Sequence, residues 1–413
     1  MAKLDVSTFA TTYAGEDLSG FVASTVIEND SISRGLVTVH ENVKKRAVIQ
    51  IVDDVVKLRD PAAAFTDQAT TTAISEKYLD PVQFEFHKQE DYSELYKSWQ
   101  SSKLKAGQMS NYDSPQDLAD FMVERYLTKI KVANERLFWL GKASVQEATM
   151  TSYTGLIPKL ITGASSDVSG YKLTSTAYAF SAITAATGVM TVSSTAAFRD
   201  GDVVTITALS TGTTTETTTD IFGNATSGSV LGQSYIVTVG SATTLVLKRN
   251  LNKQQTTRGT ATFATNNTGG GTIQYINVSN VATVLASVYA QLDYAAFDDP
   301  NFNLMIPLHV AKAYQTKQGE LATNQLGALA LPKTMKYNDM NLQVMTFFPG
   351  NTIIGAAQKN LHLGTDLLSD KNMLKVVYTG DTTADEYVRM RAGMSSDGNY
   401  VNGGEISLWY PSA

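Results

Sequence analysis

The chain has 413 residues, of which 43% are hydrophobic and 17% charged, and its formal net charge at neutral pH is −6. This size indicates two or three domains or one domain with an insertion, and the negative charge argues against a surface built wholly for nucleic acid. The absence of cysteine excludes disulfides, thiolate nucleophiles and cysteine-ligated metal sites.

The first 45 residues contain only scattered apolar positions and no sustained helical stripe. A segment of this kind cannot bury its own apolar side chains, so we expect residues 1–45 to form an arm that lies across another surface. The opening residues lack the apolar run of a secretory signal, and no stretch approaches the roughly 20 apolar residues of a membrane-spanning helix. We therefore expect no membrane partner.

An extended pattern begins at Arg46 with the run "RAVIQIVDDVVKL" and returns later in "PVQFEFHK". In the second run Val82, Phe84 and Phe86 alternate with polar residues, as a half-buried strand requires. A polar, threonine-rich stretch separates the two runs. The pattern predicts a projecting hairpin within residues 46–98, which needs support from elsewhere because an isolated two-stranded ribbon is marginally stable in water.

The clearest helix pattern follows Ser114, an N-cap serine succeeded by a proline and, three residues after the cap, by an acid. Apolar residues then recur at spacings of three and four: Ala119, Met122, Tyr126, Ile130, Ala133, Leu137 and Leu140. Polar residues occupy the opposite face: Asp120, Glu124, Lys131 and Glu135. The pattern predicts a helix over residues 115–140, about 40 Å long at ~1.5 Å per residue.

Three basic residues, Arg125, Lys129 and Arg136, line up along one edge of this predicted helix. They could face a phosphate backbone, or they could belong to an ordinary solvated helix face, which commonly has such residues. Reversing the three charges separates the two interpretations.

The composition shifts between Ile161 and Tyr275, where the sequence holds 27 threonines and only 11 charged residues. The runs "GDVVTITAL", "QSYIVTVG" and "TTLVLKRN" alternate β-branched and polar residues between turn residues, which predicts an inserted all-β barrel or sandwich over residues 161–275. We expect "STGTTTETTTDIFGNATSGS" to be an exposed loop of this module. The three glycines at 269–271 are expected to form a hinge that closes it.

Helices and strands are expected to alternate after Asn277. The run "NVSNVATVLASVYAQL" places five apolar residues on one helical face: Val281, Val284, Leu285, Val288 and Leu292. "NFNLMIPLHVAKAYQTK" predicts a buried strand that leads into a helix, and "LQVMTFFPGNTIIGAAQKNLHLG" predicts two strands joined by a turn at Pro349 and Gly350. Further strands are expected in "NMLKVVYT", "YVRMRAGM" and "GEISLWY", so the predicted class is α+β.

Residues for catalysis are scarce. The four histidines, His40, His87, His309 and His362, contain no local pair with metal-ligand spacing, and we expect them to be structural or solvated. The adjacent acids at 53–54 and 298–299 could ligate a metal, but neighbours on a strand face opposite sides and "DDPN" is typical of a turn. No nucleotide-binding or hydrolase motif occurs, so we expect no enzyme and no catalytic, cofactor or metal residues.

The order of these parts resembles the major capsid proteins of tailed bacteriophages (Caudoviricetes), which have the Hong Kong 97-like fold. The resemblance lies in the arm, the long two-stranded loop, the helix ending in "ANERLFWLGKA" and the pair of strands around Pro349 and Gly350. The stretch "KKRAVIQIVDD…FTD…KYLDPVQFEF…LYKSWQ" is similar to versions from phages of Bacteroidetes, including the crAss-like group. The resemblance to the capsid proteins as a whole covers nearly all of the chain outside residues 161–275.

The resemblance implies a division of the chain into the parts of that fold. These are an N-terminal arm (1–45), an extended loop (46–98), a peripheral domain (99–160) with spine helix 115–140, the inserted β module (161–275), a return helix (276–294), an axial domain (295–365) and C-terminal strands of the peripheral domain (366–413). The turn at Pro349 and Gly350 would then belong to the axial domain.

The resemblance also implies a function and a set of partners. Pentamers and hexamers of the chain would form an icosahedral shell around double-stranded DNA, non-covalently, in the cytoplasm of a host bacterium. Further partners would be portal, decoration and separate scaffold proteins, with DNA bound non-specifically. Three alternatives stay open: an encapsulin-like nanocompartment shell, a β-rich surface-binding protein, and a hydrolase that uses Asp298 or Asp299.

Overall fold

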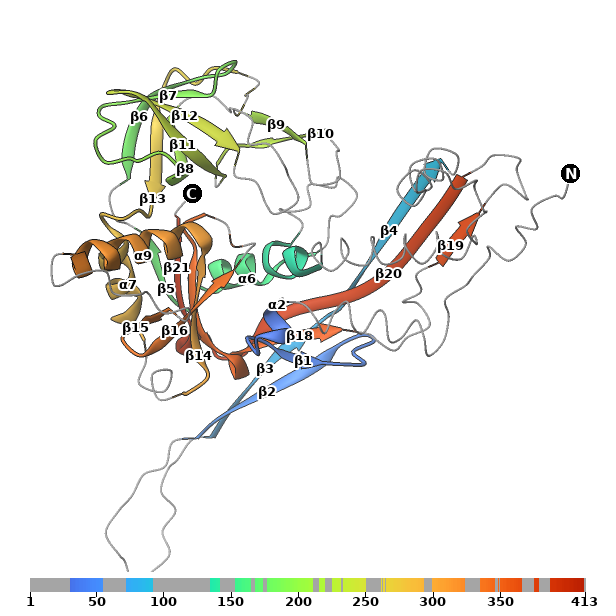
Figure 1. Ribbon diagram of the computed structural model, residues 1–413. Helices are drawn as coiled ribbons and strands as arrows, with labels where there is room; N and C mark the ends of the chain where they lie inside the picture. Colours follow the sequence, from blue (N-terminus) through green and yellow to red (C-terminus); the bar gives the residue numbers. More distant parts are fainter. Residues whose placement is uncertain are drawn as a thin grey trace, which may run out of the picture. The chain divides into compact units, whose positions relative to one another are not determined.

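The computed structural model of the chain describes residues 30–54, 72–91, 134–141, 153–164, 168–173, 177–210, 215–219, 225–231, 233–249, 261, 263, 265–292, 299–323, 335–345, 348, 350–365, 375–378 and 387–411 (Figure 1). The chain forms two compact units. Unit 1 comprises Met1–Phe138 and His362–Val401, and unit 2 comprises Trp139–Leu361 and Asn402–Ala413. Helices and strands mix along the chain and strands predominate, which confirms the predicted α+β class.

A five-stranded sheet forms the centre of unit 1. Its order is β1-β18-β20-β19, and β4 pairs with β20 as well. The strands are β1 (Thr38–His40), β18 (Leu361–Thr365), β20 (Tyr387–Tyr400), β19 (Lys375–Tyr378) and β4 (Val82–Asp91). β4 and β20 run side by side through ten registered residue pairs, from Val82↔Ser396 to Asp91↔Tyr387 (Figure 1).

A separate two-stranded sheet in unit 1 consists of β2 (Ala47–Asp54) and β3 (Thr72–Leu79). The predicted pairing of the first run with "PVQFEFHK" is therefore wrong, because that second run is β4 and pairs with β20. β3, "TAISEKYL", lies within the predicted connection, because its four apolar residues do not alternate with its four polar ones. Its pairing with β2 depends on backbone hydrogen bonds, which no apolar pattern in the sequence predicts.

The described end of the predicted long helix is helical over residues 134–140, and residues 115–133 lie outside the described residues. Leu137 and Phe138 are buried, in agreement with an apolar stripe. Glu135 was expected on the solvated face, but only 5% of it is exposed. Its Oε1 accepts a hydrogen bond of 2.9 Å from Oγ of Ser31 in helix α2 (Asp30–Ser33), so packing against this helix covers the polar face here.

Unit 2 contains a six-stranded sheet and three described helices, together called the α/β layer. The sheet order is β15-β16-β14-β17-β21-β5. Its strands are β15 (Lys336–Tyr337), β16 (Met340–Met345), β14 (Phe302–Pro307), β17 (Ile353–Ala357), β21 (Ser407–Pro411) and β5 (Ser169–Leu173). The helices are α6 (Leu156–Gly163), α7 (Val281–Tyr289) and α9 (Leu308–Thr323).

The core of the α/β layer confirms two predictions. Val281, Val284, Leu285 and Val288 of α7 are buried together, as their spacing indicated. The predicted strand and helix in "NFNLMIPLHVAKAYQTK" are β14 and α9, and both contribute to the same core. β5, by contrast, lies within the range predicted for the inserted module but pairs in parallel with β21 of the layer.

The two strands predicted around Pro349 and Gly350 are β16 and β17, but they do not pair with each other. Both flank β14, which runs parallel to β16 and antiparallel to β17. The connection between them therefore crosses over a strand instead of making a hairpin. Pro349 lies outside the described residues, and Gly350 is buried.

A closed barrel occupies most of the threonine-rich part of unit 2, with the order β11-β12-β7-β6-β13-β8. Its strands are β6 (Tyr178–Thr184), β7 (Val189–Val192), β8 (Val203–Leu209), β11 (Ser234–Ser241), β12 (Thr244–Arg249) and β13 (Gly271–Tyr275). β8, β11 and β12 confirm the three predicted strands. Their inward side chains form a core of their own around Val204, Val237 and Leu245.

Two local predictions in this region are wrong. The expected exposed loop contains a hairpin of β9 (Thr215–Thr219) and β10 (Ala225–Ser229), which pair antiparallel over five residues. The expected glycine hinge is part of the barrel wall. A Cβ on Gly271 would lie 2.7 Å from the Phe180 ring, so the glycine permits close packing of neighbouring strands.

Candidate functional site: a two-stranded ribbon with exposed apolar residues

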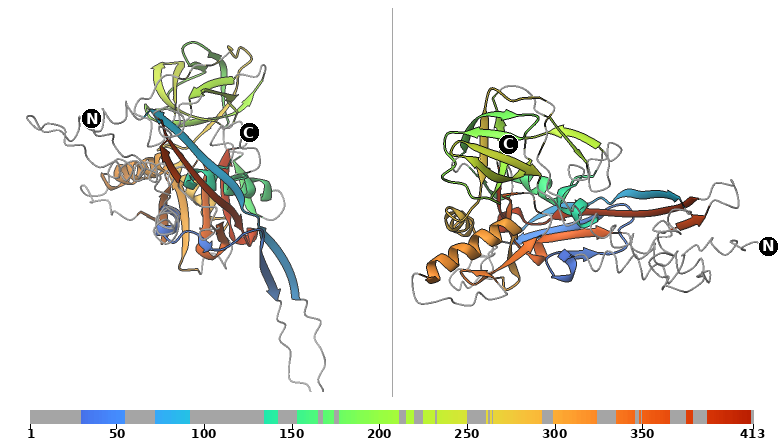
Figure 2. Two further views of the ribbon diagram at one scale, coloured as in Figure 1. Left: turned by 90° about the vertical axis from the view of Figure 1, so that its right-hand side faces the viewer. Right: turned by 45° about the horizontal axis from the view of Figure 1, so that its top comes forward.

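The β2–β3 ribbon is held together by eight registered residue pairs, from Ala47↔Leu79 to Asp54↔Thr72. The ribbon extends away from the five-stranded sheet (Figures 1 and 2). No third strand among the described residues extends it into a larger sheet. A two-stranded ribbon of this length is marginally stable alone, so its faces need to be covered.

One face of the ribbon presents large apolar side chains to solvent. The register places Val48 opposite Tyr78 and Val52 opposite Ile74, and alternate residues share a face. Val48 is 49% exposed, Val52 58%, Ile74 64% and Tyr78 40%. Because four large apolar side chains gather here on one small surface, this face is a candidate contact with another molecule. We call these four residues the ribbon face.

The opposite face of the ribbon is also apolar in part. Ile49 and Ile51 are half-buried there, and Leu79 is completely buried at the root. Half-buried Lys77 holds its Nζ 4.5 Å from the centre of the Tyr400 ring. Within the described residues, this side of the ribbon therefore contacts the rest of unit 1, through Leu79 and Lys77, whereas the four residues of the ribbon face are at least 40% exposed.

Polar contacts fix the root of the ribbon. Arg46 and Asp80 form a two-pronged ion pair with N–O distances of 2.6 and 2.8 Å, and the pair raises the pKa of Arg46. The Arg46 guanidinium also lies 4.8 Å from the centre of the Tyr78 ring. The backbone N–H of Asp80 donates to Oδ2 of Asp397, and Asn399 donates to the carbonyl of Tyr78. The contacts with Asp397 and Asn399 fasten the root of the ribbon to β20 and thereby fix its direction.

The structure describes only part of the residues that the sequence singled out. Arg125, Lys129 and Pro349 lie outside the described residues. Arg136 is described and half-buried, so at most part of its side chain is available to a polyanion. The basic edge therefore stays a prediction.

Two of the four histidines, 322 residues apart in the chain, lie in contact. Nε2 of His40 and Nδ1 of His362 are 2.6 Å apart, and the rings stack with 4.9 Å between their centres. One ring donates and the other accepts, and this contact fastens the short strand β1 to β18. No group of three or more metal-binding side chains occurs in the part of the chain that the structure describes. In the same part, no helix is both long and apolar enough to span a bilayer.

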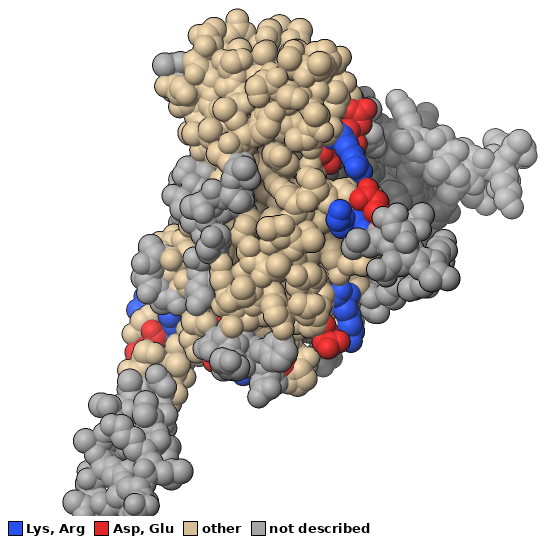
Figure 3. All heavy atoms as spheres, turned by 90° about the vertical axis from the view of Figure 1, so that its left-hand side faces the viewer, with Lys and Arg blue, Asp and Glu red and all other residues tan. Residues whose placement is uncertain are grey.

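The surface of the barrel is a second candidate site and differs in character. Figure 3 shows a barrel face that is almost wholly free of Lys, Arg, Asp and Glu. Such a surface offers uncharged groups to a partner and gives a phosphate backbone little to bind.

No protein-family model matches the chain, and no curated protein matches it. Among solved structures, it is similar to a chain of the satellite phage P4 procapsid that includes the size determination (Sid) protein, with 10% identity and a TM-score of 0.46 over 95% of this chain and 96% of that one. A chain of the native GTA particle capsid has 12% identity and a TM-score of 0.44, over 94% of this chain and 91% of that one. A chain of a virus-like particle from Pyrococcus furiosus has 9% identity and a TM-score of 0.38, over 94% of this chain and 96% of that one. All three TM-scores lie below 0.5, so we infer the function from this chain's own surfaces.

Proposed function

We propose that this chain is the major capsid protein of a tailed bacteriophage. It assembles as pentamers and hexamers into an icosahedral shell with the Hong Kong 97-like fold, which encloses double-stranded DNA. The observation behind the proposal is the ribbon face, four large apolar side chains that a single folded chain leaves between 40% and 64% exposed. A neighbouring copy that receives this face removes it from water and supports the ribbon.

The geometry of such a contact favours rings and shells. A ribbon that docks on a different surface of the next copy makes a heterologous contact, and heterologous contacts with the right rotation close into rings. Strands of eight residues are about 26 Å long, so one ribbon face covers only part of the ~800 Å² that each partner of an ordinary interface buries. The arm of residues 1–45 is the proposed source of further contact area.

The other parts have proposed roles in the same particle. The axial domain within 295–365 surrounds the five-fold and quasi-six-fold axes, and the charge-poor face of the barrel points away from the genome. Arg125, Lys129 and Arg136 are proposed to face the DNA. Reversing their charges should change the packaged genome length or the stability of the particle to salt, and no change would contradict this role. The portal, scaffold and decoration partners and the bacterial cytoplasm as the place of assembly are part of the same proposal.

Electron microscopy of the purified chain tests the proposal. We expect rings of five or six copies, or closed shells, at concentrations in the micromolar range. A particle that stays monomeric at every concentration, with amide protection throughout residues 47–79, contradicts it. Shells that enclose a specific host protein instead of empty or DNA-filled interiors support the nanocompartment alternative.

A further inference from the structure

Unit 2 contains two separate hydrophobic cores. One lies inside the barrel around Val204 and Leu245, and the other lies in the α/β layer around Leu304 and Val310. Separate cores are typical of domains that move independently of each other. Among the described residues, the hydrogen bonds that join the barrel to the layer centre on two buried asparagines, Asn351 and Asn277.

Asn351, just before β17, uses its whole side-chain amide in this junction. Its Nδ2 donates to Oγ1 of Thr205 at 3.0 Å and to the carbonyl of Gln274 at 3.1 Å, both in the barrel. Its Oδ1 accepts from the backbone N–H of Ile276 at 2.9 Å and from Nε2 of His309 at 3.1 Å. An amide has two donor hydrogens and two acceptor lone pairs, so every hydrogen-bonding position of this fully buried side chain is used.

His309 completes this arrangement from the α/β layer. The Asn351 oxygen can only accept, so Nε2 of His309 must be the protonated nitrogen of the ring. Burial lowers the pKa of His309 to about 4, and the ring is therefore neutral at pH 7. A neutral donor also suits the first turn of α9, where the helix dipole disfavours a positive charge.

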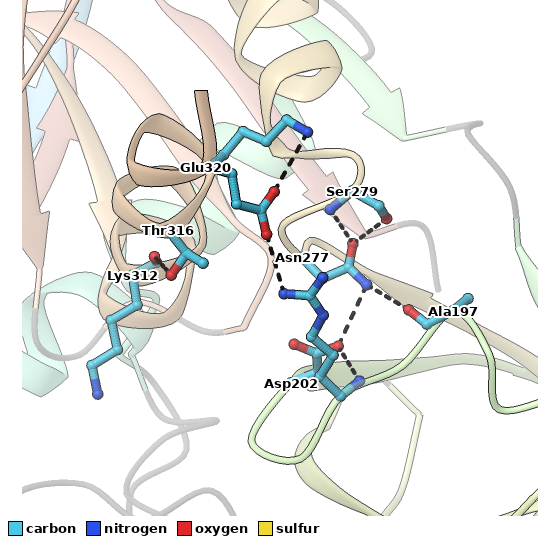
Figure 4. Close-up of polar contacts among 9 residues, drawn as sticks. Ala197, Asp202, Asn277, Ser279, Lys312, Thr316 and Glu320 are labelled. Carbon is cyan, nitrogen blue, oxygen red and sulfur yellow. Dashed lines mark hydrogen bonds and ion pairs between the residues drawn. The ribbon is translucent and has the colours of Figure 1, made fainter. Parts of the chain in front are cut away.

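Asn277 makes the second junction, at the point where the chain leaves the barrel (Figure 4). Its Nδ2 donates to the carbonyl of Ala197, in the loop before β8, at 2.8 Å. Its Oδ1 accepts from the backbone N–H and the hydroxyl of Ser279, at 3.1 and 2.6 Å. The nearby ion pair of Arg199 and Glu320 is 3.5 Å long and exposed on both sides, so it adds little.

The backbone beside Asn351 is fitted to the same contact. A Cβ on Gly350 would lie 2.7 Å from Cβ of Ser234 and 2.9 Å from Cγ1 of Val203, so only glycine lets the barrel approach this closely. Asn351 has a φ of 64°, in the left-handed region where asparagine and glycine are favoured. Both positions are therefore specified by the junction with the barrel and not by the α/β layer alone.

We propose that Asn351 locks the barrel onto the α/β layer, so that the two cores of unit 2 open and move as one body. The barrel then has a fixed orientation relative to the layer and presents its charge-poor face in one direction. This inference concerns the folded subunit and needs no shell, so it can fail without affecting the proposed function.

The test replaces Asn351 by aspartate in the full-length chain. The carboxylate has the same shape and tolerates the same backbone, but it cannot donate, and it sets an oxygen against the carbonyl of Gln274. The matched control is Asn338→Asp, since Asn338 also has a positive φ, 43°, but lies exposed in the turn between β15 and β16.

Hydrogen exchange followed by mass spectrometry provides the measurement. In the wild type and the control, we expect barrel strand β8 and layer strand β14 to be protected to the same degree. In Asn351→Asp, exchange in β8 should be at least tenfold faster while β14 keeps its protection. Equal exchange in Asn351→Asp and the control overturns the proposal, as does independent opening of the two strands in the wild type.

A second variant keeps the proposal testable if Asn351→Asp fails to fold. Thr205→Val has the same shape and removes the acceptor of the Nδ2 hydrogen bond of Asn351, together with the contacts of the Thr205 hydroxyl with Ser234 and with the carbonyl of Gly350. A smaller but selective increase of exchange in the barrel is then expected. Unchanged exchange in this variant overturns the proposal.

Discussion

Replacing Val52 and Ile74 together by threonine tests the role of the ribbon face. The two residues form a registered cross-strand pair and are 58% and 64% exposed. Threonine is also β-branched and favours strands, so the ribbon itself should still form. Because neither side chain is buried in the folded chain, the free energy of unfolding of the unassembled protein should change by no more than about 0.5 kcal/mol.

Assembly should change far more. Together the two side chains expose slightly more than one whole apolar side chain, and burying one contributes about 1.5–3 kcal/mol. A loss of about 2 kcal/mol for each docked ribbon corresponds to a roughly thirtyfold weaker association between neighbours. The critical concentration for assembly, measured by light scattering, should rise accordingly.

Gln50→Thr is the matched control, because Gln50 lies on the same face between the two apolar pairs and is already polar. Equal critical concentrations for the double variant and this control would refute the reasoning. A marked loss of stability in the unassembled double variant would refute it too, because the two side chains would then be packed within the chain itself.

Two further predictions concern the stability of the folded chain. The pKa of His309 is lowered to about 4 from an ordinary value near 6.5, so the unfolded chain takes up the proton first as pH falls. The contribution of neutral His309 to the free energy of unfolding is fully present above pH 6.5 and falls by about 3 kcal/mol as the pH is lowered to 4. In urea unfolding, the free energy of unfolding of His309→Gln should therefore fall less between pH 7 and pH 4 than that of the wild type. Leu79→Ala removes a completely buried side chain at the root of the ribbon and should cost about 2–5 kcal/mol in the same assay, whereas a loss below 1 kcal/mol would show that the root collapses around the smaller residue.

Local periodicity was sufficient to predict much of the fold. The apolar positions of α7 repeat at three and four residues and are buried together as expected. Barrel strands β8 and β11 are rich in β-branched residues and are bounded by turn residues, and the structure contains both predicted strands. In such elements the sequence near each residue determines which side is buried.

The ribbon could be predicted only in part because its pairing and its exposure depend on residues elsewhere. Half of the residues of β3 are polar, and two of its three large apolar residues, Ile74 and Tyr78, face solvent in the single chain. The partner of β4 is β20, about 300 residues later in the sequence. A pattern of one strand cannot indicate which distant strand supplies its hydrogen bonds.

The buried polar contacts could not be predicted for the same reason. His40 meets His362 only because β1 and β18 are parallel neighbours in one sheet. Asn351 stands in a polar turn that has the usual composition of a surface loop, yet it is completely buried. A turn sequence identifies the backbone conformation there, but the barrel residues that bind the Asn351 amide, Gln274 and Thr205, lie 77 and 146 positions earlier.

The position of β5 has a consequence for exchanging the barrel with another domain. Ser169–Leu173 belongs by its hydrogen bonds to β21 and the α/β layer, although it precedes the barrel in a threonine-rich stretch. Replacing the chain from residue 163 onward would remove β5, an edge strand of the six-stranded sheet, along with the barrel. Splice points at residues 177 and 276 would preserve that strand, and a replacement domain would need to bring its own partners for the amide of Asn351.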